Sequence, residues 1–220
     1  MPLSQANLAA SARHIASTLQ FTSKDRCLNI MPLFHIHGLI AGVLAPLSAG
    51  SQVFCTPGFN ALRFFKWMDE ANPTWYTAVP TMHLAIASRG KHNAEVVARH
   101  PLRFVRSSSS AMPPQLIAEL EALFKAPLIE SYGMTEAAHQ MASNPLPPLQ
   151  RKPGSVGRAA GPEIGIRGED GTMLGAGEIG VAVADSQVLE GLELQDLHPG
   201  PDIGIQVERM DAEAGRRHGE

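Results

Sequence analysis

Apolar positions recur along the chain in two rhythms, one helical and one extended. Leu8, Ala12, Ile15 and Leu19 are spaced as on one face of a helix, so they predict an amphipathic helix near the start of the chain. A second stripe predicts a helix over residues 113–124, with a proline at its start. Each stripe is apolar on one side only, which indicates helices that cover a buried surface.

Short apolar runs separate the helical patterns and predict strands. The expected strands cover residues 26–31, 51–55, 75–79, 102–107 and 128–132, and the expected further helices cover residues 38–49, 60–72 and 81–88. Strands that alternate with helices are typical of α/β proteins. We therefore expect mostly parallel sheets that are covered by helices on both faces.

The pattern changes after Asn144, where prolines and glycines replace the helical stripes. Residues 164–167 and 179–183 predict short strands, so a short β-rich part is expected to follow the α/β part. Residues 185–220 have weak periodicity and end in a polar run. We expect this segment to be a divergent, poorly ordered tail that follows a domain over residues 1–184.

The composition, 44% hydrophobic and 18% charged over 220 residues, is ordinary for a globular domain. A formal net charge of -3 creates no basic field, so neither nucleic acid nor an anionic membrane is an expected partner. The longest apolar run, residues 38–47, is well short of the roughly 20 residues that a membrane span needs. The N-terminus lacks the features of a secretory signal, and Cys27 and Cys55 lack metal-ligand spacing. A cytoplasmic location with two reduced thiols is therefore expected.

Three loops that follow predicted strands carry candidate chemistry. The first, residues 32–38, holds His35 and His37 between a strand and a buried helix, where ligands of α/β sheets bind. Both imidazoles can face one anion only if the backbone turns between them. The alternative is that one of them is a hydrogen-bonded structural histidine.

The second loop, residues 106–113, contains four consecutive serines before a helix. Their small side chains let the backbone approach a ligand, although such a run also serves as an ordinary helix cap and turn. The third loop, residues 130–139, combines an aromatic ring, a glycine, a hydroxyl and a carboxylate. These groups can stack on a base, contact a phosphate and hold Mg²⁺, and the alternative is an ordinary strand-to-loop turn.

Four motifs in the chain resemble those of the adenylate-forming superfamily, which includes the acyl-CoA synthetases. Residues 132–136, Tyr-Gly-Met-Thr-Glu, match its Tyr-Gly-x-Thr-Glu motif, and residues 32–35 match its histidine-containing motif. Residues 106–114 lie where its small-residue motif lies, and residues 153–158 are similar to its Gly-x-Val-Gly segment. The four occur in the family's order. The resemblance therefore implies part of the large N-terminal domain of these enzymes.

The resemblance implies an AMP-forming ligase, in which a carboxylate attacks the α-phosphate of ATP and the thiol of coenzyme A then displaces AMP. By this analogy His35 positions the carboxylate, Tyr132 packs on adenine, Thr135 contacts phosphate and Glu136 ligates Mg²⁺. His35, Thr135 and Glu136 are thus the catalytic candidates. The nucleotide-binding candidates are Ser108, Ser109, Ser131, Tyr132, Gly133, Met134 and Thr135.

Within the superfamily, residues 132–157 resemble the oxalate–CoA ligases, which activate a small dicarboxylate. Burial of the second carboxylate of oxalate without hydrogen-bond donors would cost on the order of several kcal/mol. His37, Ser109 and His139 can supply such donors, so they are the expected ligands of the acid. The alternative for His139 is a solvated loop residue.

The sequence departs from the family in three places. It begins just after the position of the phosphate-binding loop, and neither the ribose-binding aspartate motif nor the small C-terminal domain with its lysine is found. Because loss of one electrostatic group in such a site costs about 10² to 10³ in rate, we expect the chain alone to turn over poorly. We therefore also consider an inactive remnant that binds a nucleotide or a partner, and a complementary chain that supplies the missing segments. A peptide-synthetase adenylation module is disfavoured, because the acyl pocket of that class typically has an aspartate.

Overall fold

The structure is a computed structural model that describes residues 2–184. The expected tail over residues 185–220 lies outside the described residues. Contacts within the chain divide it into two units, one that ends at Pro162 and one that begins at Glu163. This division lies before residue 184, where the sequence predicts the end of the domain.

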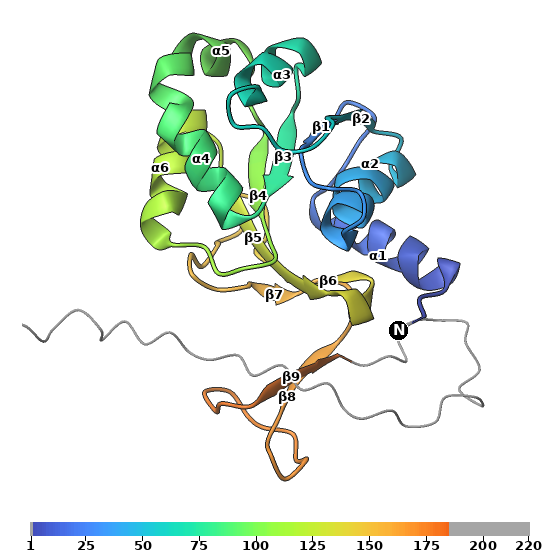
Figure 1. The fold of residues 1–220 in the computed structure, drawn as a ribbon. Coiled ribbons are helices and arrows are strands. Elements are labelled where there is room, and N and C mark those ends of the chain that lie inside the picture. The colour runs from blue at the N-terminus through green and yellow to red at the C-terminus, as the bar shows by residue number, and fades with distance from the viewer. Residues whose placement is uncertain (1, 185–220) are drawn as a thin grey trace, which may run out of the picture. The chain divides into compact units, whose positions relative to one another are not determined.

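The first unit contains the alternating strands and helices that the sequence predicts (Figure 1). Its helices are α1 (Gln5–Thr18), α2 (Ala45–Ser48), α3 (Phe64–Ala71), α4 (Pro80–Gly90), α5 (Ala94–Arg99) and α6 (Pro114–Phe124). Its strands are β1 (Arg26–Asn29), β2 (Gln52–Cys55), β3 (Trp75–Ala78), β4 (Phe104–Ser107), β5 (Leu128–Met134), β6 (His139–Ser143) and β7 (Arg158–Ala159). Helix α5 and strands β6 and β7 are the elements that the sequence did not predict.

The seven strands form one sheet in the order β2-β1-β3-β4-β5-β6-β7. Strands β1 to β5 pair in parallel, whereas β6 pairs antiparallel with β5 and β7 pairs antiparallel with β6. The expected α/β fold with a mostly parallel sheet is therefore confirmed. The antiparallel end of the sheet is the part that the simple alternation of strands and helices does not predict.

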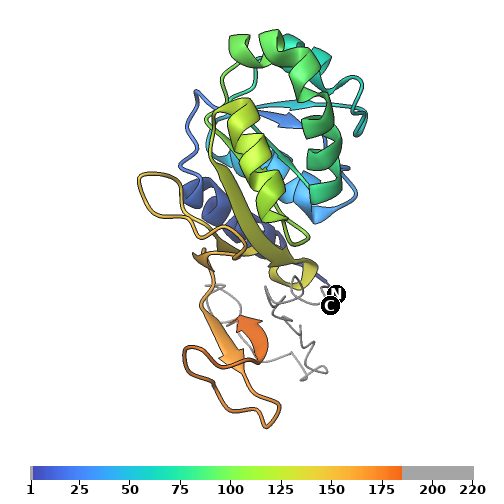
Figure 2. The same cartoon turned by 90° about the vertical axis from the view of Figure 1, so that its left-hand side faces the viewer.

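Helices cover both faces of the parallel strands (Figures 1 and 2). Each face has its own apolar core. On one face, Leu28 of β1 packs in a cluster with residues of α3, α4 and α6. On the other face, the neighbouring Cys27 packs in a cluster with residues of α1 and of the helix that follows β1. Successive residues of β1 thus enter opposite cores, as the alternation of side chains along a strand requires.

The helix that follows β1 differs from the predicted α-helix over residues 38–49. The chain forms a π-helix over His37–Leu44 and then the short α2. Gly38 at its start lies against the backbone, because a Cβ there would be 2.3 Å from the carbonyl oxygen of Pro32. Single π-helical turns are rare and occur often at functional sites. Here the π-helix begins at His37, one of the candidate ligands.

The second unit contains the two strands predicted after Asn144. Strands β8 (Ile164–Arg167) and β9 (Val181–Ala184) pair antiparallel as a two-stranded sheet. The β-rich part after the α/β part is therefore confirmed within residues 163–184.

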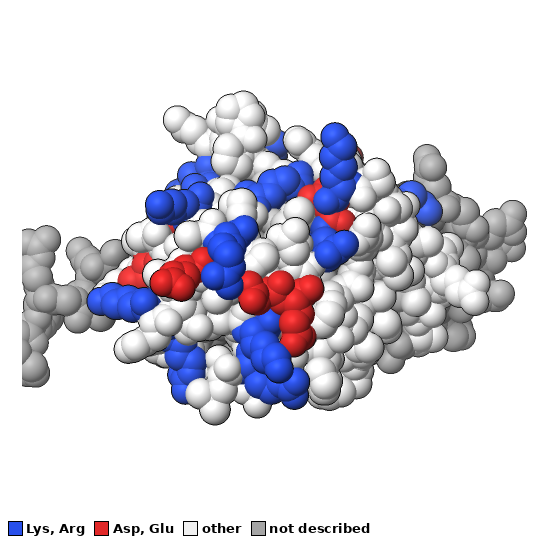
Figure 3. Space-filling view, turned by 90° about the horizontal axis from the view of Figure 1, so that it is seen from above, with Lys and Arg blue, Asp and Glu red and all other residues white. Residues whose placement is uncertain are grey.

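Charged side chains of both signs are mixed on the face of the molecule seen from above (Figure 3). Exposed ion pairs such as Lys66 with Glu70 and Arg99 with Asp69 have this character. On this face the positive and negative side chains are interspersed. In the part of the chain that the structure describes, no helix has the length and apolarity needed to cross a membrane.

Candidate functional site

The three candidate loops follow β1, β4 and β5, and the parallel pairing places the carboxyl ends of these strands at the same edge of the sheet. Ligands of open α/β sheets bind at this edge. The edge brings together His37, Ser109 and His139, the three residues predicted to bind the acid. The structure adds Arg106, Thr77 and Gln140, which the sequence analysis did not propose as ligands.

Arg106 of β4 lies at the centre of this cluster and is fully buried. One terminal nitrogen lies 3.4 Å from Nε2 of His37 and 3.4 Å from Oγ1 of Thr77. The other lies 3.4 Å from Nε2 of His139 and 3.4 Å from Oε1 of Gln140. The guanidinium therefore reaches both candidate histidines at once.

No carboxylate within residues 2–184 forms an ion pair with Arg106. Its Nε atom is also buried without a hydrogen-bond partner. Desolvation lowers the pKa of the guanidinium to about 9, so the group is still charged at neutral pH. A buried cation with only neutral partners is costly, because proteins normally pair buried charges.

His37 and His139 lie side by side in front of Arg106, with ring centroids 5.3 Å apart. Burial lowers the pKa of both imidazoles well below the ordinary value, and the Arg106 charge lowers each pKa further. Both rings are therefore neutral at pH 7. In addition, Nε2 of His37 lies 2.6 Å from Oγ1 of Thr77, and its Nδ1 lies 3.0 Å from Oγ of Ser109.

Asn29, the last residue of β1, fixes the turn that carries His37. Its side-chain oxygen accepts from the backbone N–H of Met31 at 3.1 Å, and its amide donates to the carbonyl of Gly38 at 3.5 Å. A buried amide thus joins the end of the strand to the first turn of the π-helix. This link explains why His37 is buried although it lies in a loop that otherwise exposes Phe34.

The turn separates the two histidines of the first loop. His37 is buried, whereas His35 is exposed and accepts a hydrogen bond on Nδ1 from the backbone N–H of His37 at 3.1 Å. The buried partner of His37 is His139 rather than His35. The sequence left open that one of His35 and His37 is a hydrogen-bonded structural residue. In the structure both of them form hydrogen bonds within the protein.

His139 does not lie in a solvated loop, so this alternative is wrong. It is the first residue of β6 and is 2% exposed. The chain reaches it through Ala138 and His139, both at positive φ (53° and 115°), after a register shift between Tyr132 and Gly133. A Cβ at Gly133 would lie 1.5 Å from the carbonyl oxygen of His139, so glycine is required where β6 folds back on β5.

The serines predicted to bind the nucleotide fall into two groups. Ser108 and Ser131 are buried and join the strands, because Ser108 donates to the carbonyl of Ser131 at 3.0 Å and Ser131 donates to that of Ser107 at 3.3 Å. Ser109 is exposed and has a φ of 74°, in the left-handed region that non-glycine residues seldom adopt. Ser109 is therefore the exposed member of the three serines, and its hydroxyl contacts Nδ1 of the buried His37 at 3.0 Å.

The remaining nucleotide candidates lie at the end of β5 and in the turn after it. Tyr132, Gly133 and Met134 are half-buried on the strand, Thr135 is exposed, and Glu136 is partly buried in a single 3-10 turn. Among residues 2–184 the buried hydroxyl of Tyr132 has no hydrogen-bond partner, and burial raises the pKa of this phenol. A phenol in this state can still donate to a ligand.

The residues around Glu136 can be compared with the needs of Mg²⁺. Residues 2–184 contain no cluster of three His, Cys, Asp or Glu side chains that could hold a metal ion by themselves. Mg²⁺ in nucleotide enzymes is usually held by one or two carboxylates together with phosphate oxygens. A single carboxylate beside a nucleotide site therefore fits this ion, with the phosphates as the other ligands.

A signal for Arg106 was present in the sequence, because an arginine in the middle of an apolar strand is unusual. Thr77 and Gln140 gave no such signal, since both residue types occur commonly on strands and turns. Their role in the cluster depends on the pairing of β3 with β4 and on the unpredicted β6.

Comparison with known proteins agrees with this fold. A family model described as "AMP-binding enzyme" matches residues 1–191. The chain is 45% identical to an oxalate–CoA ligase of Arabidopsis thaliana over 177 residues, which is 79% of this chain and 34% of the relative. It is 36% identical to a sulfoacetate–CoA ligase of Cupriavidus necator over 203 residues, which is 91% of this chain and 38% of the relative.

A solved structure of ATP-bound MatB from Rhodopseudomonas palustris has the same fold, with a TM-score of 0.74 and 27% identity over 83% of this chain and 36% of the other. The chain thus spans about a third of the length of the curated relatives it matches. The match of the family model over most of the chain, together with these similarities, shows that the chain belongs to the AMP-binding enzyme family, whose relatives here are CoA ligases.

Proposed function

We propose that the chain contributes the acid-binding and part of the nucleotide-binding site of an AMP-forming CoA ligase that activates a small acid with two anionic groups, with oxalate as the first candidate. The observation that supports this proposal is the buried Arg106 guanidinium, which has four neutral side chains around it and, within residues 2–184, no carboxylate partner. An anionic group of the substrate would supply the missing negative charge.

The acid binds in front of the guanidinium, at the hydroxyl of Ser109 and the rings of His37 and His139. These groups are neutral, so the attraction between the acid and the protein comes from Arg106 behind them. Two opposite charges about 6 Å apart at an effective dielectric of about 20 attract by roughly 3 kcal/mol. That attraction is sufficient to offset much of the cost of removing a carboxylate from water.

The polar character of the cluster also selects against long-chain acids. An alkyl chain beside Ser109 and His139 would leave their donors without partners, which costs about 1 to 3 kcal/mol for each buried group. A second anionic group accepts from these donors instead. The names of two relatives are consistent with this selection, because oxalate and sulfoacetate both carry two anionic groups.

The nucleotide binds at the carboxyl end of β5. Tyr132 packs on the adenine, and Thr135 contacts a phosphate oxygen. The base and the phosphate are surrounded by two segments, Ser108 to Ser109 and the end of β5 from Ser131 to Met134. Glu136 holds Mg²⁺, which when bound neutralises charge on the phosphates. The exposed His35 faces the carboxylate that is activated, and its Nε2 carries the proton because its Nδ1 accepts from the backbone.

In the proposed reaction the activated carboxylate attacks the α-phosphorus of ATP, so that pyrophosphate leaves and an acyl-adenylate forms. The thiol of coenzyme A then displaces AMP. The groups named here contribute by holding the two substrates in line. The complete reaction is proposed only for an enzyme of the relatives' full length, since this chain corresponds to about a third of that length.

Calorimetry with AMP and with ATP and Mg²⁺, each with and without oxalate, tests the proposal on the purified chain. Acetate, which has one carboxylate, is the matched control acid. We expect nucleotide binding that is lost in Tyr132→Ala and weakened in Glu136→Ala, and oxalate binding that exceeds acetate binding at least about tenfold because of the second charge.

Pyrophosphate release measured in parallel shows how much of the reaction this chain performs. Binding without turnover supports a site that requires further segments. Sulfoacetate in place of oxalate tests whether the second group must be a carboxylate. A chain that binds neither nucleotide nor acid, although it is folded by circular dichroism, would contradict the proposed function and favour a remnant without ligand binding.

A further inference from the structure

Three buried histidines surround Arg106, and each has defined hydrogen-bond partners. His37 and His139 each present Nε2 to the guanidinium at 3.4 Å. His83 presents Nε2 to the backbone carbonyl of the same arginine at 3.2 Å, and its Nδ1 lies 3.1 Å from the hydroxyl of Tyr76. All three are at most 2% exposed. Their tautomers are therefore set by the protein and not by water.

The direction of each hydrogen bond follows from what the partner can do. A guanidinium only donates, so Nε2 of His37 and Nε2 of His139 can bond to Arg106 only as acceptors. A backbone carbonyl only accepts, so Nε2 of His83 must carry a proton and its Nδ1 accepts from the Tyr76 hydroxyl. The same arginine residue thus imposes one tautomer through its side chain and the opposite tautomer through its backbone.

Thr77 links Arg106 to His37 and Ser109 in a chain of hydrogen bonds. Its oxygen accepts from a terminal nitrogen of Arg106 at 3.4 Å, so its single hydroxyl proton is free to point at Nε2 of His37, 2.6 Å away. The proton of neutral His37 then lies on Nδ1 and is donated to Oγ of Ser109 at 3.0 Å. With this tautomer the hydroxyl of Ser109 accepts from His37, and its own proton is left for a ligand.

We propose that Arg106 is a positioning residue that orients a hydrogen-bond chain through Thr77 and His37 to Ser109, and holds His139 in the same tautomer, so that the chain ends in a hydroxyl donor for the anionic group of the acid. The role for the acid rests on the proposed function. The orientation itself rests only on the contacts within the protein.

This arrangement explains why a buried guanidinium is placed behind the ligands instead of beside the acid. The Nδ1–H tautomer is the less favoured form of a free imidazole side chain, so a neutral His37 without a donor at Nε2 would often present an acceptor to Ser109. Ser109 would then donate inward, and its lone pairs would face the acid and repel it. Polarised chains of this kind strengthen the terminal donor.

Long-range proton–nitrogen NMR spectra of the chain labelled with ¹⁵N-histidine test the orientation directly, because protonated and unprotonated ring nitrogens have well separated chemical shifts. Single substitutions at each histidine assign the signals. We expect neutral rings with the proton on Nδ1 for His37 and His139, and on Nε2 for His83. A proton on Nε2 of His37 in the unmodified chain would overturn the proposal without any variant.

Arg106→Met removes the donors while it keeps much of the side-chain volume. We expect His37 and His139 to become mixtures of tautomers, His83 to keep its form, and oxalate affinity to fall about 10- to 100-fold with AMP affinity unchanged. The matched control is Arg103→Met, three residues earlier, which removes a partly buried guanidinium that has no contact with these rings. Unchanged tautomers in Arg106→Met would overturn the proposal.

Thr77→Val and Thr77→Ser separate orientation from simple charge attraction, and remain informative if Arg106→Met does not fold. Both retain Arg106, but only serine retains the hydroxyl. Thr77→Val is expected to disturb the tautomer of His37 and to weaken oxalate binding about tenfold, whereas Thr77→Ser preserves both. Equal oxalate affinity in the two variants would show that the charge of Arg106 acts alone.

The two proposals fail in different ways. If the tautomers change in Arg106→Met but the chain does not bind oxalate, the orienting role of Arg106 stands and oxalate is rejected as the ligand. Oxalate binding with tautomers that ignore Arg106 would support the proposed function and reject the positioning role.

Discussion

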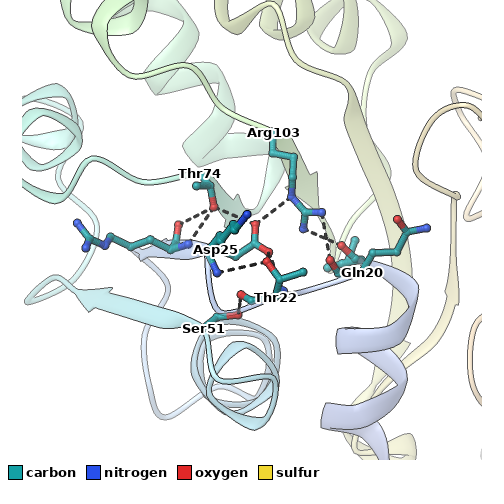
Figure 4. Close-up of polar contacts among 9 residues, drawn as sticks. Gln20, Thr22, Asp25, Ser51, Thr74 and Arg103 are labelled. Carbon is teal, nitrogen blue, oxygen red and sulfur yellow. Dashed lines mark hydrogen bonds and ion pairs between the residues drawn. The ribbon is translucent and has the colours of Figure 1, made fainter.

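Two clusters of polar side chains lie at opposite ends of the parallel strands, and each contains an arginine from the β4 segment. At the amino ends, Arg103 forms an ion pair with Asp25 at 3.0 Å and donates to the carbonyls of Leu19 and Gln20 at 2.7 and 3.2 Å (Figure 4). At the carboxyl ends, Arg106 has only neutral partners. Among the described residues, the first arginine has a carboxylate partner and the second has none.

The other polar groups of the cluster at the amino ends also have hydrogen-bond partners. The second carboxylate oxygen of Asp25 accepts from the backbone N–H of Thr22 at 2.8 Å, and the first also accepts from the hydroxyl of Thr74 at 3.1 Å (Figure 4). Ser51 donates to the carbonyl of Thr22 at 2.8 Å. A network that satisfies its own charges and lone pairs stabilises the fold, whereas one that lacks an anion is suited to bind one.

The largest expected effect is the loss of stability when the complete cluster is broken. Asp25→Ala should lower the free energy of unfolding by about 3 kcal/mol, because it leaves a partly buried guanidinium and several donors without their acceptor. The midpoint of urea denaturation measures this change.

Asp69→Ala is the matched control for that variant, since Asp69 also pairs with an arginine, Arg99, but on the exposed surface. Its denaturation midpoint should be close to that of the unmodified chain. Equal midpoints for the two variants would mean that the Asp25 cluster is no more important for the fold than a surface ion pair.

A second prediction concerns the pH dependence of stability, because the histidines whose pKa is strongly lowered lie near Arg106. Burial lowers the pKa of His83 to about 4, so the unfolded chain binds more protons between pH 6.5 and 4 and stability is lost as the pH falls through this range. Burial raises the pKa of Glu130 to about 7, so this residue has the opposite sign: its contribution is lost as the pH rises from 4.5 through 7.

Glu130→Gln separates the two effects. The variant should gain stability relative to the unmodified chain at pH 8, lose that advantage as the pH falls to 5, and therefore unfold more steeply with acid. His83→Gln should reduce the loss of stability between pH 6.5 and 4. Urea midpoints at several pH values measure both, and a Glu130→Gln difference that does not change with pH would show that this carboxyl is not shifted.

The sequence predicted most of the fold because its signals are local. The stripe that begins at Leu8 and the proline before α6 determine where helices form, and the alternation of strands and helices implies the parallel sheet. Helix α5 and strand β6 were missed, since residues 94–99 and 139–143 have no clear stripe or alternation of apolar residues. Strand β6 forms because Gly133 lets the chain fold back on β5.

The site was predictable only in part, for the same reason. His37, Ser109 and His139 were proposed from motifs, and the structure brings them together. The sequence could not predict that Arg106 is buried without a carboxylate beside it among the described residues. The neighbours of this side chain depend on how several strands and loops come together in the fold. The separation of His35 from His37 likewise depends on a π-helix that no apolar pattern indicates.

The smallest expected change in stability gives the sharpest comparison between the two arginines. Arg103→Met should lower the free energy of unfolding by about 2 kcal/mol, because Asp25 stays buried without its cation. Arg106→Met should leave that free energy unchanged or raise it by up to about 1 kcal/mol, since it removes a buried charge that no carboxylate of residues 2–184 neutralises. Urea denaturation of both variants, without added acid, measures the difference. A loss of stability in Arg106→Met as large as in Arg103→Met would mean that the carboxyl-end cluster is complete in itself, and would remove the physical reason to expect an anionic ligand there.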